Sequence, residues 1–120
     1  QDFCLYVDEF QNFSTDSFAS ILSEARKYRL NLVVANQYIG QLSDQIRDAV
    51  LGNVGTAIAY RVGNESAEVM AKYMTPIFDE ADLRQIPNYN CAMRMLIEGV
   101  PTQPFSMSAL PPLGNFNKEL

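Results

Sequence analysis

The stretch Phe3-Cys4-Leu5-Tyr6-Val7-Asp8-Glu9-Phe10 is an apolar run that stops at two adjacent carboxylates. A short, continuous apolar run is typical of a buried parallel strand with helices on both of its faces. In open α/β sheets, ligands bind just beyond the carboxyl ends of such strands. Asp8 and Glu9 stand at that point, where one acid can hold Mg²⁺ and the other can orient a water for nucleotide hydrolysis. A strand also ends in acids where an ordinary solvated loop begins, so this stretch alone leaves both interpretations open.

Composition fits a single globular domain with its own core, since the 120 residues are 48% hydrophobic and 19% charged. No apolar run approaches the roughly 20 residues that span a bilayer. Nothing marks a signal peptide, and a core strand begins almost at Gln1, which predicts a piece of a longer protein. The net charge is −5 and the basic residues are scattered, so no nucleic-acid footprint is evident.

Cys4 and Cys91 lie in apolar runs, and the chain has no histidine. Two isolated thiols cannot supply the four ligands of a zinc site. We therefore expect reduced core cysteines and a cytoplasmic location.

Strand-like and helix-like segments alternate along the chain. The elements we expect are helices over 15–29, 43–51, 65–74 and 82–86, the last with a capping box from Asp79 and Asp82, and strands over 31–35, 56–62, 91–98 and 104–107. The last two strands should pair as an antiparallel hairpin. This order predicts an α/β, three-layer architecture over residues 1–110, a mainly parallel sheet with helices on both faces, and a tail over 111–120.

The second strand ends at Asn36-Gln37. If it neighbours the first, the Gln37 amide lies beside Asp8 and Glu9. A neutral amide next to two acids suits a group that senses a γ-phosphate or positions water. Considered alone, Gln37 is more simply interpreted as a strand-end amide that caps a turn. Its expected position beside Asp8 and Glu9 favours the nucleotide-site hypothesis.

Three segments carry a family resemblance: Leu5-Tyr6-Val7-Asp8-Glu9-Phe10, Ser23-Glu24-Ala25-Arg26-Lys27-Tyr28-Arg29-Leu30-Asn31-Leu32 and Ala35-Asn36-Gln37. In this order and spacing they resemble the TraG/TraD-type coupling ATPases of conjugative type IV secretion, in the HerA/FtsK-like P-loop group. Residues 53–56, 60–63, 98–99 and 104–105 continue the match, which covers about residues 3–108. The resemblance implies a RecA-like motor, usually a hexameric ring, that uses ATP and Mg²⁺ to pump DNA.

The resemblance also implies roles for individual residues. Asp8 and Glu9 would be the Walker B pair, with Asp8 holding Mg²⁺ through water, and Gln37 would contact the nucleotide as a sensor. Arg26 matches a proposed arginine finger that reaches a neighbouring subunit; a helix C-terminal cation is an equally good interpretation. Arg61 is a weaker candidate for an interface contact. The family implies a relaxosome partner such as TraM and a parent protein at the cytoplasmic face of the inner membrane.

One departure from the family pattern is decisive, because no G-x-x-x-x-G-K-[ST] phosphate loop occurs in these residues. We therefore expect the isolated chain to bind no nucleotide and to hydrolyse no ATP. In this class the phosphate-loop strand lies between the strands expected here over 31–35 and 56–62. Without it, apolar strand edges stay open, which favours a dimer or a swapped oligomer.

Two other functions compete with this hypothesis. The chain could be a non-catalytic docking module for a protein such as TraM, with Asp8 and Glu9 as ordinary loop acids. A response-regulator-like domain with Asp8 as phosphoacceptor is disfavoured, since its additional acids and lysine are not evident.

Overall fold

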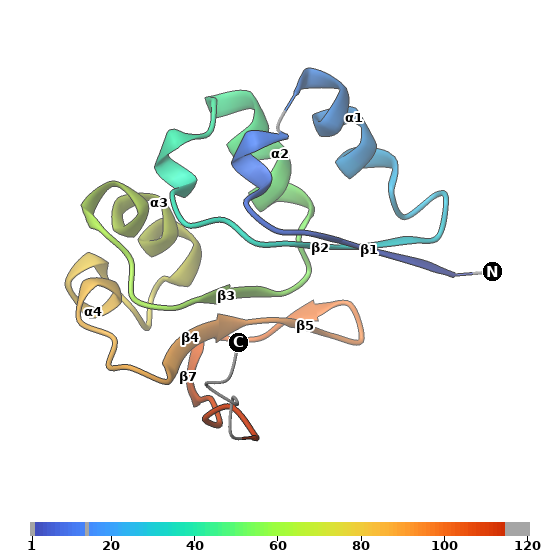
Figure 1. The fold of residues 1–120 in the computed structure, drawn as a ribbon. Coiled ribbons are helices and arrows are strands. Elements are labelled where there is room, and N and C mark those ends of the chain that lie inside the picture. The colour runs from blue at the N-terminus through green and yellow to red at the C-terminus, as the bar shows by residue number, and fades with distance from the viewer. Residues whose placement is uncertain (1, 14, 115–120) are drawn as a thin grey trace, which may run out of the picture.

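The computed structural model describes residues 2–13 and 15–114; helices and strands alternate up to residue 74, and four consecutive strands end the fold (Figure 1). The strands are β1 (Phe3–Val7), β2 (Leu30–Val34), β3 (Ala57–Ala59), β4 (Asn90–Arg94), β5 (Leu96–Ile97), β6 (Val100–Pro101) and β7 (Phe105–Ser108). The α-helices are α1 (Asp16–Glu24), α2 (Asp44–Asn53), α3 (Asn64–Met74) and α4 (Glu80–Arg84), and η1 (Phe10–Asn12) and η2 (Ile39–Gln41) are 3-10 helices. The α/β class is confirmed; of the predicted tail, residues 115–120 lie outside the described residues.

The first half of the fold is a parallel pair of strands covered by helices on one side. β1 and β2 pair in register from Phe3 with Leu30 to Val7 with Val34. Figure 1 shows α1 and α2 on the same side of this pair. Its buried core lies between helices and strands, and consists of Phe10, Leu22, Leu42, Ile46 and Val50 with Val7, Leu32 and Val34 packed against it.

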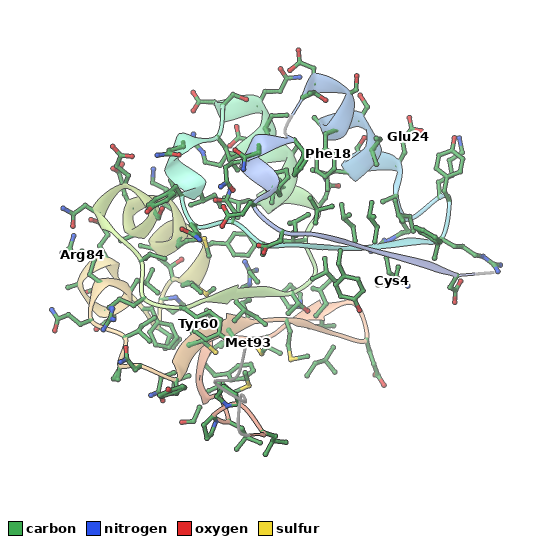
Figure 2. The ribbon with its side chains drawn as sticks, in the orientation of Figure 1. Cys4, Phe18, Glu24, Tyr60, Arg84 and Met93 are labelled. Atoms are coloured by element: carbon green, nitrogen blue, oxygen red, sulfur yellow. The ribbon has the colours of Figure 1, made fainter. Side chains whose placement is uncertain are left out.

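The opposite side of β1 and β2 is open, which differs from the predicted helices on both faces. Side chains alternate along a strand, so Cys4, Tyr6 and Val33 face away from the helices. Tyr6 is 73% exposed and Val33 is 48% exposed. In Figure 2, Cys4 lies on the side of the ribbon opposite to Phe18. No helix of the described residues covers this face.

The second half of the fold is antiparallel. β3 pairs with β4, and β4 pairs with β7, in the order β3-β4-β7. The helices α3 and α4 bury one face through a core of Ala59, Ala67, Met70, Ala71, Met74, Leu83, Ile86 and Ala92. The other face carries Ile58, Tyr60, Phe105 and Met107, all exposed. The prediction of a mainly parallel sheet was therefore wrong for the described residues, in which only β1 and β2 pair in parallel.

Toward the C-terminus, the predicted capping box and the predicted antiparallel pairing are confirmed, whereas one predicted strand is split into two. Asp79 and Asp82 form the capping box of α4, and residues 105–108 pair back on β4. The strand predicted over 91–98 is interrupted at Met95, after which β5 and β6 form a separate tight hairpin. Its two loop residues are Glu98 with φ 51° and Gly99 with φ 78°. Positive φ at both loop positions is the geometry of a type I′ turn, whose twist matches that of the strands.

The two halves meet through α3 and η2. Ile39 packs against both hydrophobic cores. A Cβ atom on Gly40 would lie 2.9 Å from the Cβ atom of Glu65, so η2 approaches α3 as closely as a glycine allows. Within the described residues, however, no strand ladder links β2 to β3. The described residues thus form the sheets β1-β2 and β3-β4-β7 and the β5-β6 hairpin rather than one continuous sheet.

Candidate functional site

The carboxyl ends of β1 and β2 lie side by side, because the parallel hydrogen-bonding pattern continues past both strands. The Ala35 amide donates to the Val7 carbonyl at 2.9 Å. The Phe10 amide in turn donates to the Ala35 carbonyl at 3.1 Å. Phe10 is 1% exposed and its ring lies 5.2 Å from that of Phe18, which anchors the loop after β1 in the core. The two loops that follow the strands are thereby fixed next to each other.

Glu9 is the centre of this edge. Nε2 of Gln37 donates a 2.7 Å hydrogen bond to Oε1 of Glu9, and the side-chain amide of Gln11 donates to Oε2. The structure therefore brings Glu9 and Gln37 together across the two strands, as their positions in the sequence predict. Because both carboxylate oxygens accept a hydrogen bond, the Glu9 side chain is held in one orientation.

Asp8 has a different environment. Its side chain is exposed, and Oδ1 accepts a 2.9 Å hydrogen bond from the backbone amide of Glu9. Mg²⁺ is commonly held by one or two carboxylates together with waters and substrate phosphates. An exposed carboxylate beside an oriented one fits that donor set, although no group of three acids, cysteines or histidines in the described residues could hold a metal alone.

Asn36 and Gln11 belong to the same edge and were not singled out from the sequence. Oδ1 of Asn36 accepts a 2.6 Å hydrogen bond from the Tyr38 amide. Its Nδ2 atom is buried and has no hydrogen-bond partner among the described residues. Since buried polar groups are rarely left unpaired, this donor is a further ligand candidate. The position of Asn36 directly after a strand was the available signal.

Arg26 lies at the other end of the β1–β2 pair. It belongs to the turn that precedes β2, and in this turn the Arg29 carbonyl accepts a hydrogen bond from the Phe3 amide. The five residues of β1 separate this turn from Asp8, which at about 3.3 Å per residue is roughly 17 Å. The structure therefore does not bring Arg26 to Glu9. Arg61 is exposed at a strand end, where its Nη2 donates to Oδ1 of Asn88 at 3.1 Å.

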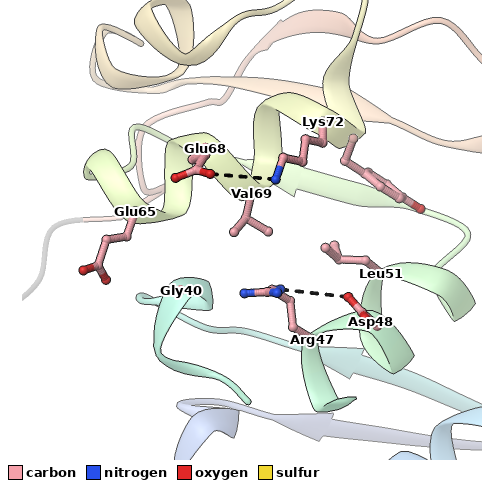
Figure 3. Close-up of a pocket in the computed structure, with 9 residues that line it drawn as sticks. Gly40, Arg47, Asp48, Leu51, Glu65, Glu68, Val69 and Lys72 are labelled. Carbon is pink, nitrogen blue, oxygen red and sulfur yellow. Dashed lines mark ion pairs between the residues drawn. The ribbon is translucent and has the colours of Figure 1, made fainter. Parts of the chain in front are cut away.

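A separate hollow of about 530 Å³ lies between α2 and α3 (Figure 3). Four of its five charged residues form ion pairs: Nζ of Lys72 lies 3.8 Å from Oε1 of Glu68, and Nε of Arg47 lies 4.0 Å from Oδ1 of Asp48. Because these charges are largely neutralised locally and belong to other elements than Glu9, this hollow is not part of the candidate site.

Both cysteines are free, and they differ in environment. Cys4 is exposed, whereas Cys91 is buried. Burial raises the pKa of the Cys91 thiol, because a thiolate is poorly solvated there. Cys91 is thus the core residue that the sequence predicts, and Cys4 is not. Among the described helices, none combines the length and the apolar character needed to cross a membrane.

Comparison with known proteins identifies a family. No curated protein matches this chain. A family model described as the TraM recognition site of TraD and TraG matches residues 2–87, which include the whole β1–β2 edge and the turn that carries Arg26. The match agrees with the resemblance seen in the sequence and covers most of the chain. The chain belongs to the family of TraG/TraD C-terminal segments that is described as the TraM recognition site.

Proposed function

We propose that this chain is the part of a conjugative coupling ATPase that supplies the Walker B and sensor residues for ATP-driven DNA translocation in type IV secretion. The observation that carries the proposal is the hydrogen bond from Gln37 to Glu9 at the carboxyl ends of two adjacent parallel strands. That edge is where ligands bind in open α/β sheets. An acid and an amide in contact there can orient a water between them.

Each residue of the edge has a distinct part in this proposal. Glu9 polarises the attacking water, and its two hydrogen bonds fix the direction of its carboxylate. Asp8, exposed beside it, would hold Mg²⁺ through water. Gln37 senses the γ-phosphate by exchanging its bond with Glu9 for one with the nucleotide. Mg²⁺ and ATP supply, respectively, charge neutralisation and the phosphoryl group.

The remainder of the site belongs to a longer protein. The chain has no phosphate loop, and in the described residues β2 and β3 are not joined. A phosphate-loop strand that pairs with both would unite the two sheets into a RecA-like domain. The distance of Arg26 from Glu9 in the same chain fits a finger that serves a neighbouring subunit of a ring. We place this motor at the cytoplasmic face of the inner membrane, with DNA as its cargo.

Hydrolysis by a longer chain that includes the phosphate loop tests the catalytic role. We expect ATPase activity that Glu9→Gln lowers by about 100-fold or more, because positioned acid–base groups contribute roughly 10² to 10⁴. Glu24→Gln, which removes an exposed carboxylate from the end of α1, should leave the rate unchanged. The 120-residue chain alone should be inactive. A Glu9→Gln variant that folds and retains the full rate would remove Glu9 from the chemistry.

The second candidate function is recognition of TraM without catalysis, and the family description favours it directly. In this case the chain alone should bind purified TraM in a calorimetric titration, and Glu9→Gln should leave the affinity unchanged. Absence of TraM binding together with Glu9-dependent hydrolysis in the longer chain would leave only the motor function. The two functions can coexist in one protein.

A further inference from the structure

The turn between α1 and β2 holds three exposed cations, Arg26, Lys27 and Arg29, that make no ion pair within the described residues. Each of the other described basic side chains forms an ion pair or a hydrogen bond. Arg47, Lys72 and Arg84 pair with acids, Arg61 bonds to Asn88, and Arg94 donates to the Tyr73 carbonyl and covers the Tyr73 ring. A local cluster of unpaired positive charge on a chain of net charge −5 is unexpected.

Backbone hydrogen bonds hold this turn in one conformation. The Leu30 amide donates to the Ala25 carbonyl at 3.0 Å, and the Arg29 amide donates to the Arg26 carbonyl at 3.2 Å. Together with the left-handed φ of 53° at Arg29, these bonds form a Schellman motif. The cations are therefore presented from a fixed backbone, so little ordering is lost when a ligand binds them.

An apolar hollow adjoins the cations. It measures about 160 Å³ and is lined by Ser20, Ile21, Glu24, Ala25, Tyr28 and Leu30. Ile21 and Tyr28 are exposed despite their apolar area, and Nζ of Lys27 lies 5.5 Å from the centre of the Tyr28 ring. Glu24, which Figure 2 labels at the end of α1, is the acid of this lining. Positive charge and a small aliphatic recess are thus combined on one surface, which we call the 26–29 surface.

We propose that the 26–29 surface binds an acidic peptide segment of a partner protein, with one aliphatic side chain in the hollow and flanking carboxylates on the cations. Charge complementarity identifies the partner as anionic. Ile21, Ala25 and Leu30 line the hollow with Tyr28 as its single aromatic residue. This favours a peptide over a nucleic acid, since nucleic acids bind along an extended basic path with several stacking aromatics. The site lies at the far end of β1 from Glu9. Lys27 and Arg29 have no part in the nucleotide chemistry proposed above, whereas Arg26 is the residue proposed there to serve a neighbouring subunit.

Fluorescence anisotropy with a short glutamate-rich peptide that contains a central leucine tests the proposal on the 120-residue chain. We expect saturable binding that weakens with added salt. The double variant Lys27→Gln/Arg29→Asn should weaken it about fivefold or more, because two exposed charge pairs are lost. Asparagine tolerates the left-handed backbone at position 29. The matched control Lys72→Gln/Arg84→Gln removes the same charge elsewhere and should change the affinity less than twofold.

The hollow is tested separately from the charge. Ile21→Ser should weaken the leucine-containing peptide but not one with glycine at its centre, and Glu24→Gln should tighten both. Three results would overturn the proposal: no binding of the acidic peptide, equal weakening by the control pair, or tighter binding of a single-stranded oligonucleotide that displaces the peptide. If the acidic peptide does not bind, the cations serve only to complement the dipole of α1. If the oligonucleotide displaces the peptide, the surface is a nucleic-acid contact.

Discussion

Glu9 holds a left-handed backbone conformation, with φ 50° and ψ 45°. Only glycine adopts this conformation without steric cost, and for other L-residues the cost is roughly 1–2 kcal/mol. In Glu9 it turns the side chain back across the end of β2, where Gln37 and Gln11 donate to the carboxylate. Two hydrogen bonds to a charged group are sufficient to offset a cost of this size. The left-handed backbone of Glu9 is therefore strained, and the same backbone conformation directs its carboxylate toward Gln37 and Gln11.

Arg29 carries the same left-handed backbone, with φ 53°, but its side chain has no compensating partner among the described residues. We predict that Arg29→Gly raises the free energy of unfolding by about 1 kcal/mol, because glycine is the preferred residue at this position of a Schellman motif. Chemical denaturation measures the change. Arg26→Gly is the matched control, since Arg26 has a negative φ, and it should lower stability by about 0.5–1 kcal/mol. Destabilisation of similar size in both variants would contradict the account.

At this scale the sequence predicted which residues meet, but not all of their partners. Asp8, Glu9 and Gln37 could be placed together because each directly follows a strand, and neighbouring parallel strands end at one edge. Gln11 and Asn36 could not be assigned, because their directions depend on the left-handed turn at Glu9 and on the bond from Tyr38 to Asn36. Long-range side-chain directions of this kind are not encoded in the apolar pattern. The catalytic roles of Asp8, Glu9, Gln37 and Arg26 remain predictions.

Elements with strong local signals were predicted well. The capping box of α4 is an example, because both of its bonds join residues three positions apart: Asp82 N donates to Asp79 Oδ1 at 2.8 Å, and Asp79 N donates to Asp82 Oδ2 at 3.0 Å. The end of α1 was less predictable. The apolar spacing continues to Arg29, but the backbone bonds tighten to a spacing of three residues after Glu24.

The strands show the limit of the apolar pattern. The run over Phe3–Val7 predicts a strand buried on both faces, whereas helices of the described residues cover only one face. Apolar residues on both faces of a strand indicate that both faces are buried, but they do not indicate which chain segment packs against each face. The same reasoning applies to β3, whose own residues do not indicate that its partner β4 runs antiparallel to it.

The Asp79 cap should contribute measurably to the stability of the second half. We predict that Asp79→Ala lowers the free energy of unfolding by about 1 kcal/mol, since the amide of Asp82 loses its acceptor. Glu80→Ala tests the specificity, because Glu80 forms an exposed pair with Arg84 at 3.7 Å, worth less than about 0.5 kcal/mol. Equal losses from the two substitutions, measured by urea denaturation, would show that general helix propensity rather than the cap is responsible.

The described residues form three small sheets, of which β1-β2 and β3-β4-β7 each have a helix-covered face and an open apolar face. The open faces carry Tyr6, Val33, Ile58, Tyr60 and Phe105 among others, all exposed. Apolar faces and unpaired strand edges of this kind promote association. The predicted self-association of the chain follows from this architecture.

Analytical ultracentrifugation tests this prediction. We expect a concentration-dependent mass above the 13.5 kDa of one chain. Tyr6→Lys places a charge on the open face of β1 and should shift the equilibrium toward the monomer, whereas Ser20→Lys on the exposed surface of α1 should not. A single species of 13.5 kDa at every concentration would mean that the open faces are tolerated in water.

We propose that the β1–β2 edge of this chain forms half of a nucleotide site. The most direct measurement is an experimental structure of a longer chain, including the phosphate loop, with Mg²⁺ and a non-hydrolysable ATP analogue. We expect an additional strand between β2 and β3, and a γ-phosphate that faces Glu9 and Gln37. An analogue bound away from Glu9, or a phosphate-loop strand elsewhere in the fold, would show that this edge is not a nucleotide site.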